Sequence, residues 1–213
     1  MAGKFIVLEG IDGAGTTTQA VLLHSALMKM EVPVHITEEP STGPIGSLIR
    51  QILHGRLITA GSSGPRAPGW NIMALLFAAD RLDHLESEIA PNLRDGINVI
   101  SDRYIFSSLV YQTVTSGENS TIKWIETINE YAVPPDIVFF LDVDHQEAQK
   151  RRMMRRIGYE LYEDLELQKK IARKYHEVLS SYNKSKIVVV DGNKSIDEVA
   201  SNILSETKKF LNL

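Results

Sequence analysis

The chain has 213 residues, 43% of them hydrophobic, with a formal net charge of −4 and no cysteine. This length and apolar content suit one domain with a substantial core, and the acidic balance argues against a general nucleic-acid binder, which needs a basic excess. Without cysteine the chain has no disulfides or thiolate metal sites, which fits a cytoplasmic protein. No apolar run approaches about 18 residues, and the first predicted strand begins near the N-terminus, so we expect neither a membrane span nor a signal peptide.

An apolar run that ends in a glycine-rich loop opens the chain, where residues 4–19 read KFIVLEGIDGAGTTTQ. A strand, a glycine loop and a helix in this order are the context of a phosphate-binding P-loop, whose backbone N–H groups cradle phosphates. Gly10 and Gly15 match the pattern G-x-x-x-x-G-K-[ST], but Thr16 stands in the lysine position. The bare glycine spacing occurs about once by chance in such a chain, so a turn that binds nothing is the alternative.

Five apolar, β-branched-rich runs predict strands buried on both faces of a parallel sheet, because each run is nearly continuous rather than alternating. They cover residues 5–8, 32–37, 97–101, 137–143 and 186–190. Helical spacing predicts helices between them, the first with Ala20, Leu23 and Leu27 on its apolar face. The other helices are expected over residues 45–53, 71–93, 104–114, 122–131, 146–156, 161–182 and 196–211.

Strands that alternate with helices predict an open α/β sandwich, with ligands at the carboxyl ends of the strands. The helix over residues 71–93 carries apolar residues at helical spacing: Ala74, Phe77, Ala78, Leu82, Leu85 and Ile89. Residues 59–69, rich in glycine, serine and proline, are expected to form one loop. Polar residues follow every predicted strand, as a ligand site would require: Glu9, Asp12, Glu38, Glu39, Pro40, Asp102, Arg103, Tyr104, Asp142, Asp144, Asp191, Gly192 and Asn193.

Asp102 follows the third predicted strand, in the position of a Walker-B carboxylate that holds Mg²⁺ directly or through water. Thr17, at the hydroxyl position of the loop, would supply the other metal contact. Asp102 could also cap the following helix, and the two roles are compatible. Arg103 would be a costly buried cation unless it met an anion, so a substrate phosphate is its natural partner.

The dense basic run KRRMMRR covers residues 150–156 of this acidic protein. A solvated helix face is the usual explanation of such a run. Because this one follows the fourth predicted strand and precedes Gly158, we favour a mobile lid that carries arginines onto a transferring phosphoryl group.

Three motifs, EGIDGAG at 9–15, LLFAADR at 75–81 and DRYIFSSLVYQ at 102–112, together resemble the thymidylate kinase family, which transfers the γ-phosphoryl group of ATP to dTMP. EEPSTGPIG at 38–46, FLDVD at 140–144 and VDGNKSIDEV at 190–199 extend the resemblance over the whole chain. It implies a single P-loop kinase domain over 1–213, built as a three-layer α/β sandwich with a five-stranded parallel sheet, helices on both faces and an arginine-rich lid at about 150–163. It also implies ATP and dTMP as substrates, Mg²⁺ as cofactor, no nucleic-acid or membrane partner, and a homodimer whose candidate surface is 71–93.

The resemblance also assigns residues to sites. ATP would lie on Gly10, Ile11, Asp12, Gly13, Ala14, Gly15, Thr16, Thr17 and Thr18, with Asn193 on the adenine side. The dTMP site would comprise Asp12, Pro40, Arg50, Phe77, Arg81, Arg103, Ser107, Ser108, Tyr111 and Gln112. The i, i+4 spacing places Phe77 and Arg81 on one helix face, where Phe77 would stack on thymine and Arg81 would bond to its carbonyl edge.

Further roles follow from the same resemblance. Asp12 would take the sugar 3′-hydroxyl, Arg103 the phosphate, and Tyr111 would press against C2′ and reject a ribose hydroxyl. Ser107 and Ser108 lie at base-contacting positions. Phe77 could instead be plain core, and Arg50 an exposed charge at a helix end.

Members of this family take an extra catalytic arginine either from the P-loop or from the lid. Residue 13 is glycine, so this chain resembles the lid type, with Arg152, Arg155 and Arg156 as candidates and Glu160 and Glu163 to orient them. These arginines, with Asp102 and Arg103, form the expected catalytic set. We expect a lid arginine to take the place that Thr16 leaves without a cation.

Two other functions stay open from the sequence. One is a different nucleoside or nucleotide kinase of the same fold, which would differ in its base pocket. The other is a weakly catalytic nucleotide-binding protein, because the P-loop lysine is absent. A purely structural α/β protein would bind neither substrate.

Overall fold

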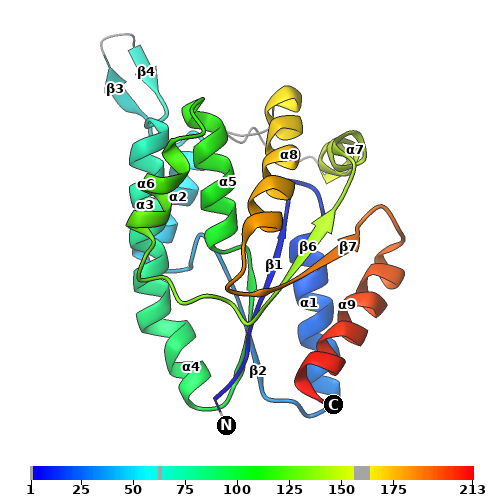
Figure 1. The fold of residues 1–213 in the computed structure, drawn as a ribbon. Coiled ribbons are helices and arrows are strands. Elements are labelled where there is room, and N and C mark those ends of the chain that lie inside the picture. Colours follow the sequence, from blue (N-terminus) through cyan, green and yellow to red (C-terminus); the bar gives the residue numbers. More distant parts are fainter. Residues whose placement is uncertain (1, 62–63, 156–163) are drawn as a thin grey trace.

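A computed structural model of the chain describes residues 2–61, 64–155 and 164–213. A five-stranded, all-parallel sheet in the order β2-β5-β1-β6-β7 forms its centre (Figure 1). The strands are β1 (Phe5–Gly10), β2 (Val34–Glu38), β5 (Asn98–Asp102), β6 (Ile137–Asp142) and β7 (Lys186–Asp191). All five predicted strands and the α/β sandwich are therefore confirmed.

The apolar runs form strands because the sheet buries them on both faces. Every residue of β1 is buried, as are the first five of β6, whereas the edge strands β2 and β7 are partly exposed. Continuous apolar sequence is what a doubly covered strand requires, since both of its side-chain rows face other protein groups.

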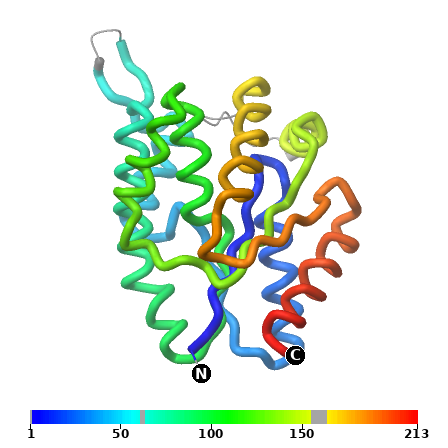
Figure 2. Tube along the Cα trace, viewed as in Figure 1, coloured from blue at the N-terminus to red at the C-terminus, as the bar shows by residue number. Residues whose placement is uncertain are grey.

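Helices cover both faces of the sheet. They are α1 (Thr16–Lys29), α2 (Pro44–Leu53), α3 (Trp70–His84), α4 (Ala90–Arg94), α5 (Ile105–Ser116), α6 (Thr121–Ile128), α7 (His145–Arg155), α8 (Leu165–Ser181) and α9 (Ile196–Leu211). Helices α1 and α9 pack together on one face, while α3, α5 and α8 lie on the other (Figures 1 and 2). Ala20, Leu23 and Leu27 of α1 are buried, as its spacing predicts.

The helix predicted over residues 71–93 contains a π-helical turn, η1 (Leu85–Ile89), between α3 and α4. Ala74, Ala78, Leu85 and Ile89 are buried, but Leu82 is 38% exposed and does not join them. Two apolar stripes therefore share this helix. Leu82 lies two turns beyond Leu75, on the exposed stripe, and the apolar pattern alone does not say which stripe is covered.

The prediction that residues 59–69 form one loop was also wrong. Strands β3 (Thr59–Gly61) and β4 (Gly64–Arg66) pair as an antiparallel hairpin that projects from the body in Figure 1. Gly64 has φ +96°, which allows the reversal, and Pro65 is tolerated because a two-stranded ribbon has free edges. Three-residue strands without apolar alternation give no periodic signal, so the composition indicated only a loop.

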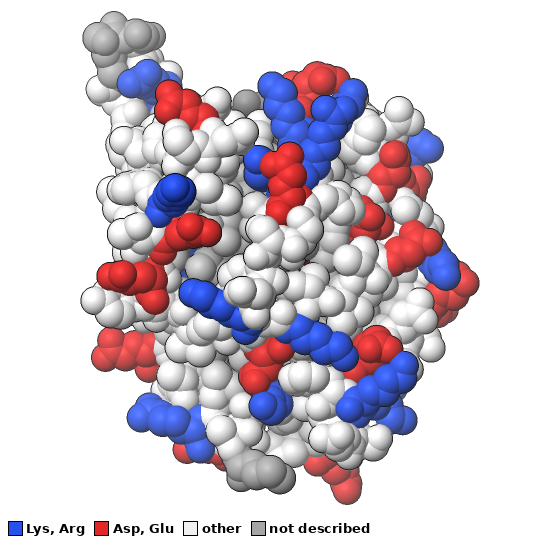
Figure 3. Space-filling view, viewed as in Figure 1, with Lys and Arg blue, Asp and Glu red and all other residues white. Residues whose placement is uncertain are grey.

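No helix among the described residues is long and apolar enough to cross a membrane. Acidic and basic side chains are interspersed over the face drawn in Figure 3.

Candidate active site

The loop between β1 and α1 has the geometry of a phosphate cradle. Gly13 and Gly15 have φ of +88° and +98°, and a Cβ on Gly10 would approach that of Ala14 to 2.8 Å. The first-turn N–H groups of a helix have no intrahelical acceptor, so the start of α1 at Thr16 offers donors to an anion. Thr16 itself is 5% exposed, and its methyl group lies against Gly10.

Thr17 and Asp102 meet across the sheet, as the sequence predicted. The Thr17 hydroxyl donates to Oδ2 of Asp102 at 2.5 Å, and Oδ1 of Asp102 is buried without a hydrogen-bond partner among the described residues. The first residue outside α5 is Tyr104, not Asp102, so the capping alternative for Asp102 does not hold. A hydroxyl and an orphaned carboxylate oxygen are hard ligands that fit Mg²⁺ bound mainly by phosphates and water.

Arg103 joins the loop to the neighbouring strand. Its guanidinium donates to the carbonyl oxygen of Gly10 at 2.9 Å, to Oδ1 of Asp12 at 2.7 Å and to Oγ of Ser107 at 3.1 Å. Its φ of +70° turns the chain sharply after β5. The cation that the sequence identified as needing an anion is therefore held beside the P-loop, with its side chain 20% exposed.

The buried carboxylate of Glu9 lies near the Arg103 guanidinium and shares Ser107 as a partner with it. Glu9 accepts from the Tyr104 N–H at 2.8 Å, from the Ser107 hydroxyl at 2.8 Å and from the Tyr175 hydroxyl at 2.9 Å. Burial raises the pKa of Glu9 to about 7, although the charge of Arg103 and these hydrogen bonds oppose the rise. Ser107 thus serves the Glu9–Arg103 network at a position predicted to contact the base.

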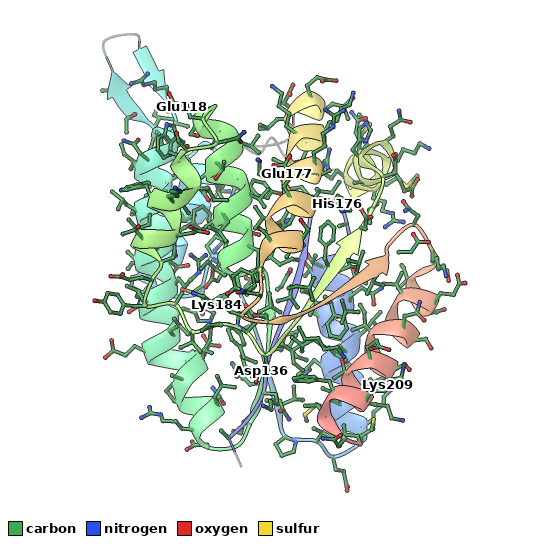
Figure 4. All side chains as sticks on the ribbon, viewed as in Figure 1. Glu118, Asp136, His176, Glu177, Lys184 and Lys209 are labelled. Atoms are coloured by element: carbon green, nitrogen blue, oxygen red, sulfur yellow. The ribbon has the colours of Figure 1, made fainter. Side chains whose placement is uncertain are left out.

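Helix α8 contributes two side chains that the sequence analysis missed. Gln168, fully buried, donates to Oδ2 of Asp12 at 2.8 Å, and Tyr175 reaches Glu9. The outer side of α8 is marked by His176 and Glu177 in Figure 4. A glutamine on the apolar stripe that Ile171 and Tyr175 continue was the available signal, because a buried amide needs partners.

A cavity of about 240 Å³ opens between α2, α3 and α5 beside this network. It is lined by Asp12, Glu38, Glu39, Pro40, Arg50, Leu53, His54, Phe77, Arg81, Arg103, Tyr104, Ser107, Ser108, Tyr111 and Gln112. All ten residues that the resemblance assigned to dTMP lie on its wall. The structure thus brings together residues from five separate segments of the chain.

Two arginines of the cavity wall have protein partners. Arg81 is 1% exposed and meets Glu39, with its Nε and Nη2 at 3.0 and 2.6 Å from Oε2. Arg50 donates to the Pro40 carbonyl oxygen at 2.6 Å and lies 3.9 Å from Glu38. Arg50 is therefore part of the wall rather than an isolated charge at a helix end.

Helix α7 packs directly on the P-loop. A Cβ on Gly13 would lie 2.4 Å from the Ala148 carbonyl oxygen and 3.0 Å from Cγ of Arg152. Arg152 donates through Nη1 to the carbonyl oxygen of Asp12, and its Nη2 is buried without a hydrogen-bond partner among the described residues. A side chain at residue 13 would occupy the space that Arg152 now fills.

Other expected residues of the lid fall outside the description. The side chain of Arg155 and the whole of Arg156, Gly158, Glu160 and Glu163 lie outside the described residues. Asn193 is described: its Oδ1 accepts from the Asp144 N–H at 3.0 Å and its Nδ2 donates to Asp191 at 3.0 Å. It ties together the loops after β6 and β7.

The sheet order explains how these parts are arranged. The P-loop follows the central strand β1, the cavity residues follow β2 and β5 on one side, and Asn193 follows β7 on the other. A ligand in the cavity and a ligand over the loops after β6 and β7 would therefore meet at the P-loop.

Comparison with known proteins identifies the family. A sequence model of the thymidylate kinase family matches residues 8–203. A "Probable thymidylate kinase" of Thermococcus kodakarensis is 38% identical over 211 residues, covering 97% of this chain and 98% of the relative. Proteins of the same description from Methanococcus maripaludis (strain S2) and Pyrococcus horikoshii are 43% and 36% identical, covering 95% and 99% of this chain and 94% and 98% of the relatives.

Proposed function

Because the chain belongs to the thymidylate kinase family, whose members phosphorylate dTMP, we propose that it transfers the γ-phosphoryl group of ATP to dTMP, giving dTDP and ADP, with Mg²⁺ as cofactor. A single domain over 1–213 would carry the whole site. The rival possibilities are a kinase of the same fold with another acceptor base and a nucleotide-binding protein with weak turnover.

Arg103 is the observation that carries the proposal. One guanidinium contacts both Gly10 and Asp12 of the P-loop and lines the acceptor cavity. An acceptor phosphate held by Arg103 would lie next to phosphates held by the loop. Phosphoryl transfer needs little covalent chemistry from the protein, so this positioning and neutralisation of charge supply most of the catalysis.

The acceptor nucleoside fits the remaining wall of the cavity. Phe77 offers a half-buried ring for stacking, and Arg81 lies one turn further along α3. Asp12 is held by Arg103 and Gln168, yet each carboxylate oxygen keeps a lone pair for a sugar hydroxyl. The Tyr111 ring, whose centroid lies 5.5 Å from Cζ of Arg103, would border the sugar C2′.

Thr17 and Asp102 would hold Mg²⁺, the orphaned Oδ1 of Asp102 being the open ligand position. When bound, the ion neutralises charge on the ATP phosphates. ATP would extend from residues 10–18 toward Asn193, with its adenine beside the loop that Asn193 and Asp191 form.

Arg152 is our candidate for the cation that replaces the P-loop lysine, whose position Thr16 occupies. Its guanidinium already lies on the P-loop at Asp12, and its Nη2 has no hydrogen-bond partner within the described part of the chain. A hydrogen bond from a charged group contributes about 1.5–3 kcal/mol, enough to offset the loss of a lysine contact. Arg155 and Arg156 would assist from the lid, which we propose to cover about residues 150–163.

We also propose a homodimer that forms through α3. Ile72, Leu75 and Leu82 are 45%, 52% and 38% exposed and recur at helical spacing on its outer side. An apolar stripe on a solvent-exposed helix face is typical of a contact surface between protein chains.

A coupled assay of ADP release tests the proposed reaction. The purified protein is assayed with ATP and dTMP, dUMP, dCMP or UMP, each with and without Mg²⁺. We expect ADP formation that depends on dTMP, is much weaker with dCMP and UMP, and is lost in excess EDTA. Preference for another base would identify the different kinase, and calorimetric binding of ATP and dTMP without turnover would identify the weakly catalytic protein.

A further inference from the structure

Arg81, at the base end of the cavity, is held by side chains from three other segments. Glu39 follows β2, Ser108 lies on α5 and Asn129 directly follows α6. All four residues are at least 95% buried. The ring of Tyr104 also faces the guanidinium, with Cζ 5.2 Å from the ring centroid. A guanidinium that is buried in this way must find its hydrogen-bond acceptors in the protein or in the cavity that it lines.

The hydrogen bonds of Arg81 can be counted donor by donor. A guanidinium has five N–H groups. Nε–H and one Nη2–H reach Oε2 of Glu39, the second Nη2–H reaches Oγ of Ser108 at 3.0 Å, and one Nη1–H reaches Oδ1 of Asn129. One Nη1–H has no acceptor among the described residues, and Arg81 lines the cavity, where a ligand could accept from it.

Asn129 presents an oxygen to Arg81 because its other end is fixed. Its Nδ2 donates to the Ile125 carbonyl oxygen at 2.8 Å, one turn back in α6. The amide therefore cannot turn its NH₂ toward the arginine without breaking that bond. Glu39 is held less completely: its Oε1 is buried without a hydrogen-bond partner among the described residues, 3.7 Å from Nδ1 of His84.

We propose that Glu39 and Asn129 are positioning residues that set base specificity by fixing the plane of Arg81 and leaving one N–H to face the ligand. A fixed donor matches a carbonyl oxygen, as on thymine or uracil, and opposes the exocyclic amine of cytosine. If Arg81 could turn, it would move away from an amine and the discrimination would fall. The inference rests on the proposed function, since it assumes a pyrimidine in this cavity.

Asn129→Ala is the first test, because it removes one clamp but leaves the Glu39–Arg81 ion pair intact. We expect KM for dTMP to rise about tenfold and the preference for dTMP over dCMP in kcat/KM to fall about tenfold, the scale of one hydrogen bond to a charged group. The kcat for dTMP should stay within about twofold, because Asn129 is not placed at the reacting atoms.

Two further variants separate positioning from simple stabilisation. Asn129→Asp keeps an oxygen toward Arg81 and should restore most of the base preference, even though it loses the bond to Ile125. Thr127→Ala, a change at an exposed residue near the end of α6, is the matched control and should alter neither KM nor preference. Glu39→Gln, which keeps an acceptor oxygen but no charge, should act in the same direction as Asn129→Ala.

The outcomes distinguish this inference from the proposed function. If the wild type phosphorylates dTMP and Asn129→Ala lowers the melting temperature without changing the dTMP-to-dCMP ratio, the residue is only structural and the inference is wrong. If the wild type does not turn over dTMP, the proposed function is wrong. Calorimetric dissociation constants for dTMP and dCMP then decide, and equal affinities, or no binding of dTMP, would overturn the inference as well.

Discussion

Among the single residues of the site, Glu9 lies at the centre of the buried polar network beside the P-loop. It accepts hydrogen bonds from three residues of the site and lies near the Arg103 guanidinium. Burial raises its pKa from an ordinary value of 4.5 to about 7. The unfolded chain therefore loses this proton at a lower pH than the folded protein.

This shift makes folding stability depend on pH with a definite sign. Between about pH 4.5 and 7 the unfolded state binds fewer protons than the folded state, so the stability that Glu9 contributes below pH 4.5 is lost as pH rises to 7. The loss would be about 3 kcal/mol, at about 1.4 kcal/mol for each pH unit. Urea unfolding of the wild type and of Glu9→Gln across this range should show that the variant's free energy of unfolding rises relative to that of the wild type as pH rises. Parallel curves would contradict the assignment.

The sequence identified the site residues that belong to motifs, and it missed the residues that position those site residues through hydrogen bonds. Thr17, Asp102 and Arg103 were predicted because loop spacing and strand ends give local signals. Asn129 and Gln168 act on residues far away in sequence, Arg81 and Asp12, so no local pattern names them. A buried amide on an apolar stripe indicates that a partner exists, but only the packing of α8 shows that the partner is the P-loop.

At the scale of elements, α7 and the P-loop form one unit through Gly13. The backbone there has φ +88°, and the Ala148 carbonyl oxygen would lie 2.4 Å from a Cβ. Any side chain at residue 13 must displace α7, and Arg152 with it. The glycine is thus required both by its conformation and by the close approach of a helix.

Gly13→Ala should therefore lower kcat about 10²-fold, the cost typical of losing a transition-state contact. The matched control is Gly117→Ala, which has a similar φ of +77° but nothing within 4 Å of the new Cβ. Both variants should lose about 1–3 kcal/mol from backbone strain, and only Gly13→Ala should lose activity. Equal kcat values in the two variants would contradict the role of α7.

Element prediction succeeded where periodicity was long and failed where it was short. Continuous apolar runs predicted the five strands, and apolar residues with a 3.6-residue period predicted the long helices. The hairpin of β3 and β4 has only three residues per strand, which is too short for a periodic side-chain pattern. The π turn η1 likewise leaves no periodic mark within the helix that it interrupts.

At the scale of the whole molecule, two apolar stripes on α3 face different ways. One packs into the core through Met73, Ala74 and Ala78, and the other leaves Ile72, Leu75 and Leu82 exposed. The sequence could not separate the buried stripe from the exposed one, because both stripes have helical spacing. The sheet and its layers decide which stripe is covered.

Leu75→Glu should convert a dimer into a monomer, because a charge buried in an apolar contact without a partner is costly. Sedimentation or light scattering of the wild type should give the mass of two chains, and of the variant one. Met28→Glu, at a residue of nearly equal exposure on α1 (54% against 52%), is the control and should remain dimeric. A wild type that sediments as a monomer would contradict the proposed dimer.

We propose that this P-loop works without its lysine because Arg152 supplies the cation. The rate of ADP formation from ATP and dTMP tests this claim when it is measured in four proteins: wild type, Arg152→Ala, Thr16→Lys and the double variant. We predict that Arg152→Ala lowers kcat about 10²–10³-fold, that Thr16→Lys alone changes it little or lowers it, and that Thr16→Lys restores at least about tenfold when Arg152 is absent. A kcat of Arg152→Ala within about twofold of the wild type, or a gain of more than about tenfold from Thr16→Lys alone, would contradict the claim.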